Sequence, residues 1–147
     1  MALIEQIEQD LITALKEKDE ATVSTLRMLK SALKNKEIAL KAPLKEEDIL
    51  TVIQSQIKSR QDSAELYKQG NRLELAEKEK QEIEILRSYL PAQMGEDEIR
   101  TKIAAIIQEV SAKDIKDMGK VMGRAASELK GKADMSEVSR IVKESLE

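Results

Sequence analysis

The sequence predicts an all-α protein, with an N-terminal bundle of about four helices followed by a small three-helix C-terminal domain. Apolar residues recur every three or four positions along most of the chain, and no stretch alternates as strands do. Two tyrosines are the only aromatic residues, so aliphatic side chains must supply the buried surface, which suits helix-on-helix packing. The stretch Leu90–Gly95 joins two periodic segments through proline and glycine, which predicts domains over residues 1–92 and 93–147.

Two helices are predicted in the first 43 residues. The first covers residues 3 to 17, and Asp19 is positioned to cap the second by accepting backbone N–H bonds. Pro43 ends the second helix, because proline disfavours helical geometry at the residue before it. The apolar stripe of the second helix consists of Leu26, Leu29, Leu33 and Leu40.

A row of basic residues adjoins that stripe. Its members are Arg27, Lys30, Lys34 and Lys41. One interpretation is a solvated face whose aliphatic stems cover the edge of the core. The other is a cationic patch for nucleic acid, with Arg27, Lys30 and Lys34 as the candidate residues.

Three more helices are predicted before residue 111. The third is closed by Gly70, and Asn71 with Glu74 is a capping pair for the fourth, which runs to Leu90. The fifth is defined by Ile99, Ile103, Ile106, Ile107 and Val110. Charged residues near the junction of the third and fourth helices, namely Arg60, Asp62 and Arg72, predict an ion network that holds those two helices together.

The last third of the chain predicts two helices around a tight turn. An apolar face places the first of them at residues 117 to 129, and Gly131 has the position of a left-handed residue that ends a helix. Asp134 or Ser136 caps the next helix. Gly119 and Gly123 inside the first helix each cost about 1 kcal/mol relative to alanine, which indicates close approach by a neighbouring helix or by a nucleic-acid backbone.

Five cations surround this helix and turn. Lys116, Lys120 and Arg124 fall opposite the apolar face, and Lys130 and Lys132 flank Gly131. Together with the amides at the start of the last helix they are candidates to hold an anion such as a phosphate. The alternative is that Lys130 and Lys132 only offset the carbonyl dipole of the preceding helix.

Several of these segments resemble known families. Met118–Gly123 followed by Lys130–Asp134 is similar to the tail domain of the B subunit of glutamine-dependent aspartyl/glutamyl-tRNA amidotransferase. The whole chain resembles the small stand-alone YqeY family, which carries that tail without the catalytic part of the subunit. The other stretches that carry the resemblance are Leu26–Asn35, Arg60–Ser63 with Asn71-Arg72, and Tyr89–Gln93. Met135 departs from the family pattern, in which glycine often follows the equivalent of Ala133-Asp134.

Composition excludes several kinds of chemistry. The chain has no cysteine and no histidine, so disulfides, thiolate nucleophiles, Cys/His zinc sites and the usual neutral-pH proton shuttle are absent. We expect no catalytic residues, no metal and no cofactor. A net charge of −3 argues against a DNA-binding protein, so any RNA contact must use local patches. The acidic N-terminus and the lack of long apolar runs predict no membrane contact and a cytoplasmic location.

The function expected from these observations is that of a small non-catalytic helical adaptor. The resemblance to the amidotransferase tail implies contact with tRNA or with a tRNA-handling protein complex, through Lys116, Lys120, Arg124, Lys130 and Lys132. It also relates the chain to a carbon–nitrogen ligase with glutamine as amide donor, but without the catalytic portion we expect no activity alone. The alternative is a protein-interaction module with no role in RNA binding.

Overall fold

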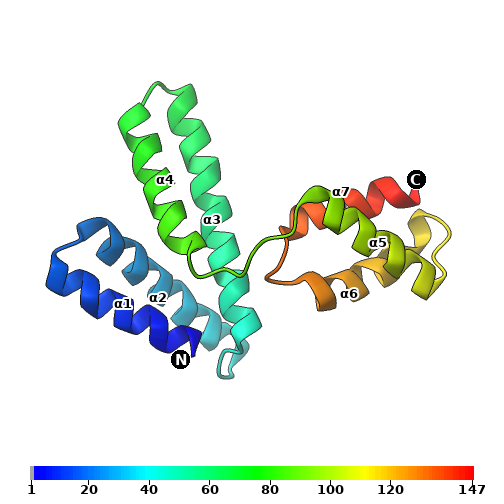
Figure 1. The fold of residues 1–147 in the computed structure, drawn as a ribbon, viewed down its shortest axis with the longest axis horizontal. Helices are drawn as coiled ribbons and strands as arrows, with labels where there is room; N and C mark the ends of the chain where they lie inside the picture. The colour runs from blue at the N-terminus through cyan, green and yellow to red at the C-terminus, as the bar shows by residue number, and fades with distance from the viewer. Residues whose placement is uncertain (1) are drawn as a thin grey trace. The chain divides into compact units, whose positions relative to one another are not determined.

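The computed structural model describes residues 2–147 and confirms the predicted all-α class. Within that range the chain forms seven α-helices and one short 3₁₀ helix, and its only bridge of the β type joins the turn residues Lys130 and Ala133 (Figure 1). The helices form two compact units, the first ending at Leu90 and the second spanning Pro91–Glu147. The predicted division into domains at residues 92 and 93 stays a prediction.

The first unit is a bundle of four helices. They are α1 (Leu3–Glu17), α2 (Glu20–Leu40), α3 (Glu46–Gln69) and α4 (Leu73–Arg87). Their shared core consists of Ile7, Leu26, Leu29, Leu33, Ile49, Ile53, Ile57, Ile83 and Leu86. Each helix therefore contributes apolar residues to the core, because burial of an apolar stripe against neighbouring helices is the main source of stability.

The ends of these helices follow local chemistry that the sequence shows only in part. Asp19 caps α2 as predicted, since its Oδ1 accepts a hydrogen bond from the Thr22 amide at 3.2 Å. The predicted cap of α4 by Asn71 is wrong: α4 begins after Arg72 without a side-chain cap. Asn71 instead takes the left-handed conformation (φ 57°) that helps to close α3, a position that asparagine tolerates better than most residues. Helix α4 also stops at Arg87, short of the predicted Leu90.

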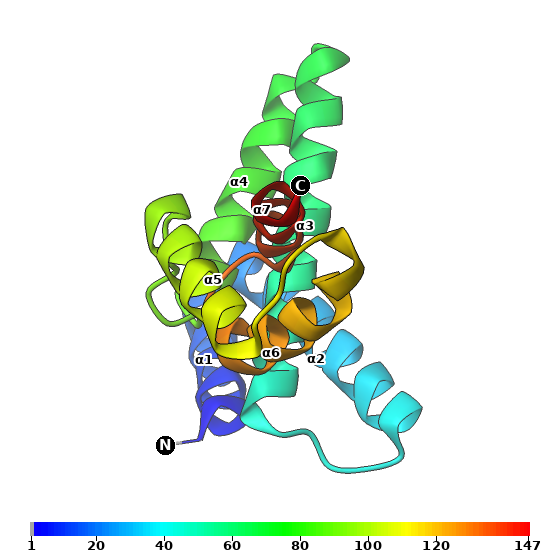
Figure 2. The ribbon, with the colours of Figure 1, turned by 90° about the vertical axis from the view of Figure 1, so that its right-hand side faces the viewer.

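Helices α3 and α4 form an antiparallel hairpin, seen from two directions in Figures 1 and 2. A buried ion pair lies inside it: the Arg60 Nε is 3.1 Å from a carboxylate oxygen of Glu82, and the two side chains are 7% and 8% exposed. Arg60 also donates to Gln56 Oε1 at 2.7 Å and to the sulfur of Met28 at 3.5 Å. The predicted ion network therefore exists at Arg60, whereas Arg72 is exposed and pairs locally with Glu74.

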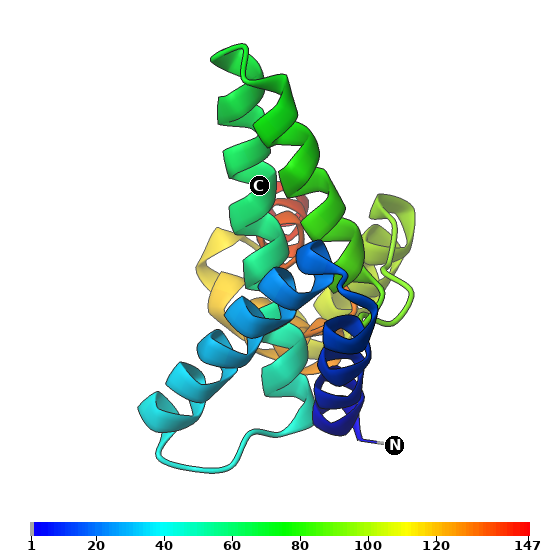
Figure 3. The same cartoon turned by 90° about the vertical axis from the view of Figure 1, so that its left-hand side faces the viewer.

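The C-terminal end of α2 extends beyond the core of its unit. Figure 3 shows this end pointing away from α3, with residues 41–45 looping back to the start of that helix. Ile38 is 63% exposed and Leu40 is 44% exposed. The prediction that Leu40 belongs to the buried stripe is wrong, because no helix of the unit covers the last turns of α2.

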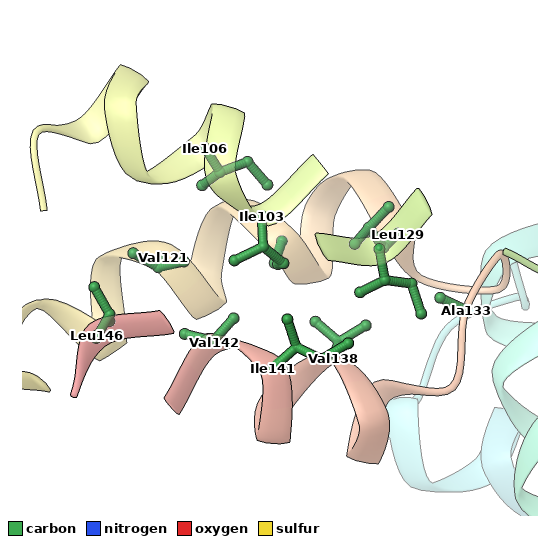
Figure 4. Close-up of a cluster of buried hydrophobic side chains, with 11 residues drawn as sticks. Ile103, Ile106, Val121, Leu129, Ala133, Val138, Ile141, Val142 and Leu146 are labelled. Atoms are coloured by element: carbon green, nitrogen blue, oxygen red, sulfur yellow. The ribbon is translucent and has the colours of Figure 1, made fainter. Parts of the chain in front are cut away.

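The second unit contains three α-helices, α5 (Glu96–Val110), α6 (Met118–Leu129) and α7 (Met135–Leu146), with the 3₁₀ helix η1 (Ile115–Asp117) before α6. Their inward side chains point toward one another in Figure 4. The core consists of Ile99, Ile103, Ile106, Val121, Ala125, Leu129, Ala133, Val138, Ile141, Val142 and Leu146. The three predicted helices of the C-terminal domain are thus confirmed.

The segment before α5 is attached to the turn between α6 and α7. Gln93 Nε2 donates to the carbonyl of Gly131 at 3.1 Å, and the Met94 amide donates to the carbonyl of Lys132 at 2.9 Å. Met94 also packs against the core of the second unit. These contacts hold the backbone of the turn that carries Lys130 and Lys132.

Among the helices of residues 2–147, none has the length and apolar character needed to cross a membrane.

Candidate nucleic-acid interface

The five cations predicted in the tail lie on α6 and its two ends. Lys116 belongs to η1, Lys120 and Arg124 to α6, and Lys130 and Lys132 to the turn that follows α6. All five side chains are exposed. The helix is amphipathic because Val121, Ala125 and Leu129 enter the core, and this leaves the cations on its solvent side.

The turn presents two lysines from a rigid frame. Gly131 is buried and has φ 83°, a left-handed conformation that L side chains rarely adopt. The buried methyl group of Ala133 anchors the other side of the turn. Lys130 and Lys132 therefore extend into solvent from positions that the backbone fixes.

An acidic residue shares this turn with the lysines. The Asp134 Oδ1 accepts hydrogen bonds from the Ser136 amide at 2.9 Å and from the Ser136 hydroxyl at 2.6 Å, as an N-cap of α7. Capping by Asp134 is as predicted. Its carboxylate occupies the N-terminus of α7, where the sequence suggested an anion site, so a phosphate would have to rely mainly on the ammonium groups.

Arg124 is less available than the sequence suggests. Its Nη2 lies 2.7 Å from a carboxylate oxygen of Glu109 on α5, and its Nε lies 3.7 Å from Glu128 one turn along α6. Glu128 is visible in the sequence as an i,i+4 partner. Glu109 comes from another helix, and no local pattern could identify it. A phosphate that binds Arg124 must compete with two carboxylates.

Lys120 has a different electrostatic neighbour. This neighbour is the carboxyl of Asp117, which accepts a hydrogen bond from the Lys113 amide at 2.9 Å. That bond is the main reason why the pKa of Asp117 lies below its usual value, and the positive charge of Lys120 lowers it further. No ion pair within 4.0 Å involves Lys120 among residues 2–147. Lys120 therefore keeps its ammonium group free for an external anion.

Gly119 and Gly123 lie on the exposed side of α6. A β-carbon built on either residue meets nothing within 4 Å, leaving aside the adjacent residues and the backbone of the helix. Of the two predicted causes of close approach, a neighbouring helix within residues 2–147 is therefore not present at these glycines. Approach to them by a partner helix or by a nucleic-acid backbone stays a prediction. Their cost of about 1 kcal/mol each has no explanation in the internal packing of this unit.

The second predicted basic patch is on α2, in the first unit. Arg27, Lys30 and Lys34 are all exposed on this helix. The chain has seven arginines, all within residues 2–147, and six of them form ion pairs with carboxylates. Arg27 is the exception in the part of the chain that the structure covers, so its guanidinium has no carboxylate partner in this chain.

An open groove of about 450 Å³ in the first unit has acidic walls that include Asp10, Glu17 and Asp19. The Tyr89 hydroxyl donates to Asp10 at 2.5 Å in this groove; burial, reinforced by that bond and by the charge of Asp10, raises the pKa of Tyr89. Across residues 2–147, no three acidic side chains come together as potential metal ligands. The groove thus offers a structural hydrogen bond and no arrangement that we can assign to a reaction.

Comparison with known proteins assigns the chain to a family. A protein-family model described as "Yqey-like protein" matches residues 4–146, nearly the full length. The chain belongs to the YqeY-like family. Both basic surfaces, on α2 and on α6, lie within the part of the chain that this YqeY-like match covers.

Several YqeY-like relatives carry the name "Altered inheritance of mitochondria protein 41, mitochondrial". The protein from Pyrenophora tritici-repentis is 29% identical over 146 residues, which cover 97% of this chain and 80% of the relative. The proteins from Vanderwaltozyma polyspora and Lachancea thermotolerans are 34% and 35% identical over 111 residues. These alignments span 60% and 59% of the relatives' own lengths, so those relatives are considerably longer than the matched region.

The predicted cytoplasmic location is wrong by this comparison, because the YqeY-like relatives carry mitochondrial names. That prediction rested on an acidic N-terminus and on the lack of long apolar runs. Proteins of the cytoplasm and of other aqueous compartments can share both properties, so composition could not distinguish these locations.

Proposed function

We propose that this YqeY-like chain is a non-catalytic helical adaptor that contacts tRNA through the exposed side of α6 and the turn after it. The observation that supports this most directly is the combination of cations and glycines on one surface. Lys120 is exposed on the same helix as Gly119 and Gly123, and Lys130 is exposed at its end; a β-carbon on either glycine would meet no described atom within 4 Å outside the adjacent residues and the helix backbone. A nucleic-acid backbone needs both positive charge and room for close approach.

The mode of contact would be recognition of phosphate and shape. The chain has no tryptophan, no phenylalanine and two tyrosines, and both tyrosines lie in the first unit, so the tail offers no aromatic ring for stacking on bases. Lysine ammonium groups act as point charges toward phosphate oxygens and carry no base specificity. Binding should therefore be modest and should weaken steeply as salt rises.

The test is fluorescence anisotropy of labelled tRNA titrated with the full chain at two salt concentrations, beside a duplex RNA of equal length. We expect a preference for tRNA. Replacement of Lys130 and Lys132 by alanine should weaken tRNA binding about tenfold. The slope of log affinity against log salt concentration should fall by the amount that corresponds to roughly two phosphate contacts. Both side chains are exposed, so circular dichroism should show unchanged helicity.

The matched control replaces Lys102 and Lys143 by alanine. These lysines are exposed on α5 and α7 of the same unit, so the variant loses the same charge elsewhere. Equal weakening by both double variants would mean that only net charge matters. Wild-type affinity in the Lys130/Lys132 variant would remove the turn from the proposed site.

A second candidate function is a protein-interaction module without RNA binding. The open strip at Gly119 and Gly123 favours it too, since small residues on a helix also permit close approach of a partner helix. The anisotropy experiment separates the two candidates. A partner-helix role predicts equal, weak and salt-sensitive binding to tRNA and duplex RNA, and no special effect of Lys130 and Lys132.

A further inference from the structure

The outer face of α2 carries a row of cations that ends in an apolar side chain. Starting from Ile38 and moving toward the N-terminus, the row continues through Lys34, Lys30 and Arg27, at steps of four, four and three residues. Ile38 is 63% exposed, and the three cations are also exposed. These steps keep the four residues on one side of the helix over about three turns.

The outer face of α4 carries the complementary row. Starting from Leu73 and moving toward the C-terminus, it continues through Glu77, Gln81 and Glu84, again at steps of four, four and three residues. Leu73 is 59% exposed, and the other three residues are exposed as well. Glu84 pairs with Arg87 at 3.0 Å, and this exposed pair contributes little to stability.

The two rows match when the helices lie antiparallel. The facing pairs are then Ile38 with Leu73, Lys34 with Glu77, Lys30 with Gln81, and Arg27 with Glu84. Within one copy this pairing does not occur, because α2 and α4 contact each other through their buried faces, where Leu29 and Leu86 share the core. Inside the first unit the outer rows are therefore not paired with each other.

We propose that these rows join two copies of the chain, with α2 of each copy lying antiparallel against α4 of the other. The interface is isologous, since the same two surfaces of each copy take part, and two reciprocal contacts close it as a dimer. The apolar pair at the end of each contact supplies burial, and the ion pairs determine register and direction. This inference is independent of the proposed RNA contact, which lies in the other unit.

A polyanion is the competing occupant of the α2 row, as the sequence suggested for Arg27, Lys30 and Lys34. Two observations favour a second copy. Ile38 continues the row with one of the most exposed large apolar side chains of the first unit, and phosphates offer nothing to an exposed isoleucine. The matching row on α4, with Leu73 at the corresponding end, carries the carboxylates of Glu77 and Glu84, which repel phosphates.

Charge reversal tests the dimer in full-length chain. Sedimentation equilibrium at low salt should show concentration-dependent self-association of the wild type, weaker at high salt. Lys34→Glu and Glu77→Lys should each weaken it at least about tenfold, because each places like charges opposite each other in both contacts. The double variant Lys34→Glu/Glu77→Lys should restore it. An equimolar mixture of the two single variants should form a mixed dimer.

The matched control is Lys58→Glu, which reverses an exposed lysine on α3 of the same unit and should leave association unchanged. Circular dichroism confirms that each variant is folded. A wild type that stays monomeric at every concentration would overturn the proposal, as would a double variant that associates no better than the singles. If Lys34→Glu weakened tRNA binding and left self-association intact, the α2 row would be an RNA surface and the dimer assignment would be wrong.

Discussion

At the scale of single residues, the ion pair between Arg60 and Glu82 joins the two buried charged side chains of the first unit. It joins α3 to α4 at 3.1 Å, and Arg60 reaches the sulfur of Met28 on α2 as well. The free energy needed to remove two charges from water offsets most of the attraction between them. The pair therefore contributes more to the register of the hairpin than to its net stability.

This view predicts an asymmetry between single and double substitutions. Arg60→Met should lower the free energy of unfolding by about 3 kcal/mol, because it leaves the Glu82 carboxylate buried without its partner. Arg60→Met/Glu82→Leu should recover most of that loss, since two apolar side chains fill the same space. Urea denaturation followed by circular dichroism measures both variants, and an additive double variant would contradict the argument.

The availability of individual cations shows what the sequence could and could not predict. Exposure of Lys116 and Lys120 follows from helical periodicity, and exposure of Lys130 and Lys132 follows from their place beside the turn at Gly131. The pairing of Arg124 with Glu109, and the isolation of Arg27, depend on which helices come together. Periodicity assigns a side chain to a face, whereas its electrostatic partner is a property of tertiary structure.

At the scale of elements, α6 contains two glycines where most helices have side chains. Gly119→Ala and Gly123→Ala should each raise the free energy of unfolding by about 0.5–1 kcal/mol, because nothing within 4 Å opposes the added methyl group. If the strip receives an RNA backbone, the same substitutions should weaken tRNA binding severalfold. Thermal denaturation and anisotropy on one set of samples give both readouts.

The control for these variants is Thr101→Ala on the exposed side of α5, which also raises helix propensity but lies away from the strip. Its RNA affinity should equal that of the wild type. Glycine variants that gain stability and bind RNA normally would mean that no ligand approaches α6 at these positions.

Helix ends were the elements least accessible from sequence. The sequence pair Asn71 and Glu74 matches a capping pattern, yet Asn71 is used to close α3, because a left-handed residue is needed there and Gly70 has φ −84°. The existence of all seven helices depended on long apolar periodicity, which is robust. Their ends depended on which of two neighbouring helices uses a given residue as its cap, and apolar periodicity does not indicate this.

At the scale of the whole molecule, the chain forms two compact units, and the segment that precedes α5 makes contacts with the second of them. Gln93 and Met94 bind the turn at residues 131–132, so they belong structurally with the second unit. These contacts specify where a fragment that contains the second unit should begin.

A fragment of residues 91–147 should be helical and should unfold cooperatively. A fragment of residues 96–147 should be less stable by about 2 kcal/mol, because it loses two hydrogen bonds and the packing of Met94. Gln93→Ala in the longer fragment removes only the side-chain bond and should give an intermediate value. Equal stability of the two fragments would show that the contacts of Gln93 and Met94 add nothing.

The attachment of Gln93 to Gly131 also has a consequence for the order of events during synthesis. The two residues are 38 positions apart, so the bond closes a ring that contains α5, η1 and α6. A chain leaving the ribosome exposes Gln93 first and must wait until Gly131 has emerged before the ring can close. We therefore expect α5 to lack stable tertiary contacts until Gly131 has been synthesised. The second unit, residues 91–147, should then fold late in translation and in one cooperative step.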